Sequence, residues 1–154
     1  MIRSFFRFVQ SIVLLVACAS AGAQTPSRPD IVDLVNKTIS HAQKVGVAQA
    51  AADVNAQADW KVKGLNTVMF NFDGLNLASA INPRIVGKMM IEAKDPSGKQ
   101  FVKEFIGIAK SAKGEGWVEF QFLSPETNQV EPRIMFVRRV PGQEALVGVA
   151  ASKT

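Results

Sequence analysis

The sequence is poor in the side chains that carry most catalytic and metal chemistry. It contains no tyrosine, one cysteine and one histidine in 154 residues. The histidine, His41, has no carboxylate three or four residues away on its expected helix, and one histidine without partners makes no metal site. No Ser-His-Asp set, Cys-x-x-Cys pair, His-Glu-x-x-His motif or glycine-rich phosphate loop is present. We therefore expect no catalytic residues, no metal, no cofactor and no enzymatic activity.

Long hydrophobic runs are also missing, apart from one near the N-terminus. Arg3 and Arg7 lead into an apolar run from Phe8 to Ala21, and an Ala-x-Ala-like site precedes Gln24. This is the order of a secretory signal, and the run is shorter than the roughly 18–20 residues that a spanning helix needs. We predict a signal peptide over residues 1–23, cleaved before Gln24, and a periplasmic mature protein.

The single cysteine lies inside this segment and allows a second interpretation. Leu15-Val-Ala-Cys18 resembles the lipobox of a bacterial lipoprotein, in which Cys18 would carry the lipid and become the first mature residue. The Ala-x-Ala site lies at the more usual distance past the apolar run, which favours ordinary cleavage. Both alternatives remove Cys18 from thiol chemistry, so disulfides and thiol catalysis are excluded.

Length and charge indicate one exported domain that follows a flexible start at residues 24–29. Residues 30–154 suffice for a single domain with a sizeable core, and seven of the ten phenylalanines and both tryptophans are available to fill it. The formal charge of +5 includes Arg3 and Arg7 of the predicted signal. The remaining lysines and arginines are scattered, apart from Arg138-Arg139, so no nucleic-acid partner is expected.

Helical periodicity starts after Pro29, with Asp30 as the expected N-cap. Apolar residues three or four apart form one stripe: Ile31, Leu34, Val35, Ile39, Ala42 and Val45. Gly46 interrupts the pattern, and an alanine-rich run to Ala58 resumes it. We therefore predict a long helix with a bend or break at Gly46.

From Thr67 the apolar period changes to two, as in strands that bury one face. Strands are expected at 67–72, 75–80, 117–122, 133–140 and 145–150. Short links between consecutive strands favour an antiparallel sheet. Between the second and third strands, Phe101, Phe105, Ile108 and Ala112 share one face of an expected helix.

Six segments follow one another in the order of a known family. They are Phe72-Asp-Gly-Leu75, Asn82-Pro-Arg-Ile-Val-Gly-Lys88, Lys94-Asp-Pro-Ser-Gly-Lys-Gln-Phe-Val-Lys-Glu104, Gly114-Glu-Gly-Trp-Val-Glu-Phe120, Pro132-Arg-Ile-Met-Phe-Val-Arg-Arg-Val-Pro-Gly142 and Leu146-Val-Gly-Val149. In these segments the chain resembles a single Cache domain of the second type, the extracytoplasmic sensor module of many bacterial chemoreceptors and kinases. The helical pattern from Ile31 to Trp60 fits the long N-terminal helix of that fold, so the resemblance covers nearly the whole mature chain.

The resemblance implies an α+β, PAS-like Cache fold. A long N-terminal helix packs on a roughly five-stranded antiparallel sheet, and a short-helix flap covers the other face. Family members typically bind small carboxylates such as acetate, propionate or pyruvate between the sheet and the flap. By position, the implied ligand-binding residues are Phe120, Phe122, Arg133, Phe136 and Ser79.

Four of these positions differ from the usual family residues. The family usually has tyrosine where this chain has Phe120 and Phe136, tryptophan where it has Phe122, and often histidine where it has Ser79. Without phenol hydroxyls, a buried carboxylate loses its expected hydrogen-bond donors. The pocket is therefore either more apolar, or dependent on Arg133, or no longer a ligand site.

The alternation of side chains along a strand predicts which of the candidate ligand-binding residues share one face of the sheet. If the strands pair as in the family, Phe120 and Phe136 are neighbours on the flap side. Arg133 has the opposite parity from Phe136, so we expect it to point away on a regular strand and to reach only the rim of the pocket, near Pro132.

Two function classes remain open. The first is a periplasmic binding or sensing domain, with a small organic acid or similar metabolite as ligand and a membrane receptor or transporter as partner. The second is a degenerate Cache domain that serves as a protein-interaction or structural module without a ligand. Because the sequence stops at Thr154, just past the last strand, we expect it to signal only through a separate partner. A homodimer through the N-terminal helix is a further expectation.

Overall fold

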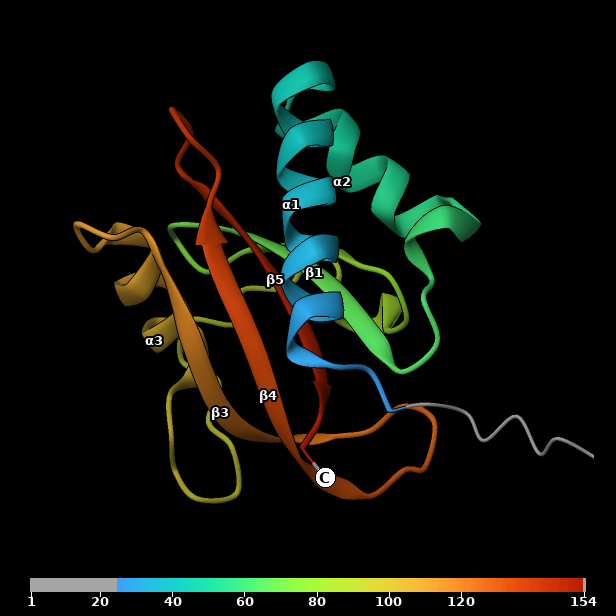
Figure 1. Cartoon of the computed structure of the whole chain (residues 1–154). Coiled ribbons are helices and arrows are strands. Elements are labelled where there is room, and N and C mark those ends of the chain that lie inside the picture. The colour runs from blue at the N-terminus through green and yellow to red at the C-terminus, as the bar shows by residue number, and fades with distance from the viewer. Residues whose placement is uncertain (1–24, 154) are drawn as a thin grey trace, which may run out of the picture.

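The computed structural model describes residues 25–153 and shows a sheet with helices on both faces (Figure 1). The predicted signal peptide, Cys18 and Gln24 lie outside the described residues.

The first helix, α1 (Arg28–Val45), begins two residues before the expected N-cap at Asp30. Ser27 is the N-cap instead: its hydroxyl accepts the Asp30 N–H at 3.4 Å, and the Asp30 carboxylate accepts the Ser27 N–H at 2.7 Å. This capping box satisfies two N–H groups reciprocally. Pro29 lies inside the first turn, where its missing N–H is not needed. The prediction of Asp30 as N-cap is therefore wrong.

The expected break at Gly46 separates α1 from a second helix, α2 (Val47–Ala56). Gly46 has φ 85° and ψ 157°, a conformation that residues with a Cβ rarely adopt. α2 folds back against α1, and Nε2 of His41 on α1 lies 2.6 Å from Oδ2 of Asp53 on α2. The single histidine thus takes its carboxylate partner from another helix.

Within residues 25–153, five strands form one antiparallel sheet in the order β2-β1-β5-β4-β3. They are β1 (Leu65–Asn71), β2 (Asn76–Ser79), β3 (Glu115–Leu123), β4 (Val130–Arg139) and β5 (Ala145–Ser152). The last strand is the central one, and its side chains are buried from Ala145 to Ala151 because helices cover both of its faces. The structure confirms the predicted antiparallel architecture.

The helices divide between the two faces of the sheet. On the helix face, α1 and α2 bury residues such as Val35 and Val149 in one core. On the flap face, α3 (Phe101–Lys110) buries residues such as Phe105 and Leu146 in a second core. Figure 1 shows α1 in front of β5 and β1, with α3 beyond β3, and the start of α1 at the same end of the sheet as the C-terminus.

The flap comprises residues 80–110 and joins β2 to β3. It contains a short helical turn, η2 (Pro83–Ile85), and then α3. The buried residues of α3 are Phe101, Val102, Phe105, Ile106 and Ala109. Of the residues expected on one helix face, Ile108 is half-buried and packs against the same core, whereas Ala112 lies exposed beyond the end of the helix, so the expected helix is too long at its end. The apolar face includes Val102, Ile106 and Ala109, which rotates it away from Ile108.

The turn before α3 covers the edge of β3. The Asp95 carboxylate accepts the Gln121 N–H at 3.1 Å, and Nζ of Lys99 donates to the Glu119 carbonyl at 2.5 Å. The Ser97 hydroxyl and the backbone N–H groups of Gln121, Lys99 and Ser97 lower the pKa of Asp95 to about 2. Part of the exposed edge strand is therefore capped within the chain, which protects it from pairing with another strand.

Candidate ligand-binding site

The register of the sheet decides which predicted residues meet. Phe120 on β3 pairs with Arg133 on β4, so these two side chains share the flap face. Phe136 pairs with Trp117, and both belong to the core on the helix face. The expectation that Phe120 and Phe136 are neighbours is therefore wrong, as is the expectation that Arg133 points away.

The flap face carries a cavity with a volume of about 40 Å³, room for roughly three water molecules. It lies between the sheet, the flap and the loop that joins β3 to β4. The lining residues are Asn66, Val68, Phe70, Ile81, Ile85, Met90, Phe101, Phe105, Phe120, Phe122, Pro125, Arg133, Met135 and Ala150. Among these described residues, Asn66 and Arg133 are the two polar ones.

Five phenylalanines line the cavity, and the rings of four of them, from β3 and α3, pack together in one group. The rings of Phe101 and Phe120 stack with centroids 5.1 Å apart, and Phe105 meets Phe120 edge-on at 5.3 Å. Phe122 meets Phe101 edge-on at 5.9 Å. This wall suits a short hydrocarbon group, and it combines two predicted strand residues with two residues of α3.

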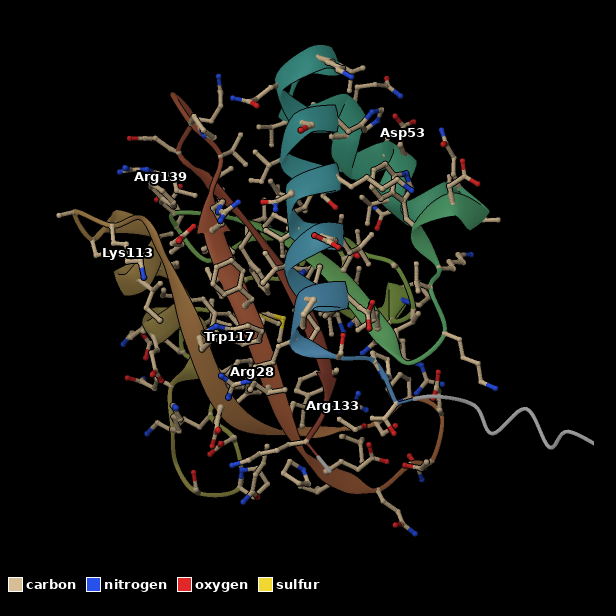
Figure 2. All side chains as sticks on the ribbon, viewed as in Figure 1. Arg28, Asp53, Lys113, Trp117, Arg133 and Arg139 are labelled. Atoms are coloured by element: carbon tan, nitrogen blue, oxygen red, sulfur yellow. The ribbon has the colours of Figure 1, made fainter. Side chains whose placement is uncertain are left out.

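Arg133 supplies the charge at the cavity. The residue is 9% exposed, and Nη2 lies 3.0 Å from Oε2 of Glu131. Its Nε is buried without a hydrogen-bond partner among the described residues. Figure 2 places Arg133 towards the start of β4, at the end of the sheet where the C-terminus lies. A buried guanidinium with an unused donor is suited to bind an anion or a carbonyl oxygen.

Ser79 lies next to this cavity without lining it. The residue is buried; its hydroxyl donates to Oδ1 of Asn66 at 3.3 Å and accepts the Asn82 N–H at 3.2 Å. Asn66, which does line the cavity, was not predicted. A polar residue with flap-side parity at the start of an apolar strand was the signal that could have identified it.

The remaining lining residues come mainly from segments whose position in space the sequence does not determine. Phe101 and Phe105 were predicted only as buried residues of a helix. Met90 and Pro125 belong to the flap and the β3–β4 loop, and no periodicity marks them. Among residues 25–153, no group of three or more His, Cys, Asp or Glu side chains is placed to hold a metal ion.

The chain belongs to the family called Single Cache domain 2, whose sequence profile matches residues 36–152. Cache domains of this family are extracytoplasmic and sensory rather than catalytic. Among curated proteins, none matches the sequence significantly. In the described part of the chain, no helix has the length and apolarity to span a membrane.

Solved structures of sensor domains share the fold. A methyl-accepting chemotaxis protein from Vibrio parahaemolyticus RIMD 2210633 is 15% identical with a TM-score of 0.67, over 80% of this chain and 86% of the other. A periplasmic sensor domain of a chemotaxis protein is 19% identical with a TM-score of 0.63, over 80% and 88%. A Cache chemosensory domain described with carboxylic acid recognition is 14% identical with a TM-score of 0.68, over 82% and 92%.

Proposed function

We propose that this chain is a periplasmic sensor domain that binds a small carboxylate in the flap-side cavity. The observation that carries the proposal is the buried Arg133, which lines a largely apolar cavity and whose Nε has no hydrogen-bond partner among the described residues. Guanidinium groups bind carboxylates through charge-assisted hydrogen bonds. The Phe101 and Phe120 rings suit the short apolar tail of the same ligand. The carboxylic acid recognition described for a solved domain of the same fold supports the ligand class.

The proposed sensor acts through a separate membrane receptor or transporter. The predicted signal peptide supports delivery to the periplasm, and the sensory role of the family supports a signalling partner. A homodimer through α1 stays a proposal. The outward residues of α1 are polar, which would make such an interface polar; they include Asp33, Asn36, Lys37, Ser40 and Gln43.

The alternative is a ligand-free interaction module. It is favoured by the small volume of the cavity, about 40 Å³, and by phenylalanine at the positions where the family usually has tyrosine. In this alternative, Phe120 and Phe122 are core residues and Arg133 serves only its ion pair with Glu131.

Titration of the mature domain with propionate distinguishes these alternatives. Arg133→Ala should weaken binding at least about thirtyfold, because the ligand carboxylate loses its charged partner. Arg133→Gln is the second variant, since it removes the charge but can still donate to Glu131 and preserve the fold. Circular dichroism and the melting temperature check folding. Propionate affinity that is unchanged in both variants, or no binding of small carboxylates to the wild type, would favour the interaction module.

A further inference from the structure

Glu131 lies on the flap face of β4, two residues before Arg133 on the strand. Besides its contact with Nη2 of Arg133 at 3.0 Å, its carboxylate accepts the Thr127 hydroxyl at 2.5 Å and the Ser152 hydroxyl at 3.1 Å. These three partners come from β4, the β3–β4 loop and β5. Glu131 is therefore held in one position beside the guanidinium.

The charge of Glu131 balances that of Arg133. The Thr127 hydroxyl, the Ser152 hydroxyl and the Arg133 charge lower the pKa of Glu131 below its ordinary value, so the carboxyl is ionised at neutral pH. Two lysines that line a surface hollow together with Arg133 have their own partners: Lys153 pairs with Glu119 at 2.6 Å, and Lys99 pairs with Glu104 at 2.7 Å. The charges of Arg133 and Glu131 thus cancel at this end of the cavity.

We infer that Glu131 is a specificity-determining residue that restricts the cavity to ligands with at most one negative charge. The inference rests on the proposed function, because it concerns the same site. A neutral ligand leaves Arg133 and Glu131 balanced, whereas a monocarboxylate leaves one net negative charge. A dicarboxylate leaves two negative charges beside an apolar wall, and the desolvation cost of such charges is high.

Geometry makes this repulsion direct. Nη2 of Arg133 is engaged by Glu131, so a ligand oxygen on another nitrogen of the same guanidinium would lie about one guanidinium width from the Glu131 carboxylate. At an effective dielectric constant of about 20 to 40, two like charges at that range alter affinity by roughly tenfold to a hundredfold. Glu131 therefore affects ligands according to their charge rather than their shape.

Three probes with the same three-carbon skeleton test the inference: propionamide, propionate and malonate, with charges of zero, one and two at neutral pH. Their affinities are measured by titration calorimetry at fixed salt for the wild type and for Glu131→Gln. Glutamine preserves the volume and keeps an oxygen that can accept from Thr127 and Ser152. Glu126→Gln is the matched control, since Glu126 is an exposed acid of the β3–β4 loop.

In Glu131→Gln, propionamide affinity should stay within about twofold, propionate affinity should rise about tenfold, and malonate affinity should rise more. Glu126→Gln should resemble the wild type with every probe.

If Glu131 has only a structural role, Glu131→Gln should lower the affinity for all three probes alike. That result overturns the inference and leaves the proposed function intact. Unchanged ratios between the three affinities overturn it as well. Failure of both the wild type and Glu131→Gln to bind any probe overturns the proposed function together with this inference.

Discussion

Phe120 and Phe136 show how a single residue's role depends on the face that it occupies. Phe120 lies opposite Arg133 and contributes to the cavity wall. Phe136 packs against Trp117 with ring centroids 5.0 Å apart, and the Arg138 guanidinium lies 5.4 Å from its ring. Phenylalanine in place of the family's usual tyrosine therefore has different consequences at the two positions.

Phe120→Tyr should strengthen propionate binding roughly two- to tenfold, because a phenol hydroxyl adds a donor to a cavity with few donors. The measurement is titration calorimetry of the variant beside the wild type. Phe136→Tyr is the control on the opposite face, and its propionate affinity should not change. Equal effects of the two variants, or no gain from Phe120→Tyr, would contradict the binding role of Phe120.

At the scale of the elements, Gly46 turns one helical stretch into two helices. The two helices then pack together on the helix face. There the Asp53 carboxylate accepts hydrogen bonds from the His41 ring and from the side-chain amides of Gln49 and Gln57. The hydrogen bond with His41, and after it the one from Gln49, lower the pKa of Asp53. The orientation of α2 against α1 therefore depends on a backbone conformation that glycine adopts most readily.

Gly46→Ala should destabilise the domain by about 1–3 kcal/mol, because φ 85° with ψ 157° is strained for alanine even though the added Cβ meets nothing within 4 Å. Gly107→Ala in α3 is the matched control: its Cβ also meets nothing, and it should stabilise the helix by about 0.5–1 kcal/mol. Chemical denaturation measures both free energies. A loss of similar size in both variants would contradict the role of the Gly46 backbone.

The whole molecule places its two cores on opposite faces of one sheet, and the cavity lies only on the flap face. The helix face is filled by α1 and α2, whereas the flap face is closed by α3 and by segments with little regular structure. A ligand that entered under the flap would contact the flap and central strands together. This arrangement is consistent with the sensory role of Cache domains.

Export is a prediction about the whole molecule and can be measured directly. Mass spectrometry of the periplasmic fraction should give a mature protein that begins at Gln24, and Cys18→Ser should leave both its mass and its location unchanged. Ala23→Arg should block cleavage, because a small residue is needed before the site. A lipid-modified N-terminal Cys18, lost in Cys18→Ser, would instead establish the lipoprotein alternative.

The sequence by itself determined the local features of this protein. Alternating apolar residues identified the strands, Gly46 marked the break between helices, and short links indicated an antiparallel sheet. Each of these follows from periodicity or from the backbone preferences of a few neighbouring residues. The resemblance to the Cache family, by contrast, named Phe120, Phe122 and Arg133 as candidate site residues before their arrangement was known.

Only the tertiary structure decided which of these residues meet. The pairing of β3 with β4 sets Phe120 opposite Arg133 and sends Phe136 to the helix face. The position of a residue within its own strand does not reveal how two strands pair, because the register depends on the loop that joins them. The Asp53 partner of His41 likewise required two helices to pack. Contacts between distant segments arise from the packing of the whole chain, and local patterns do not encode them.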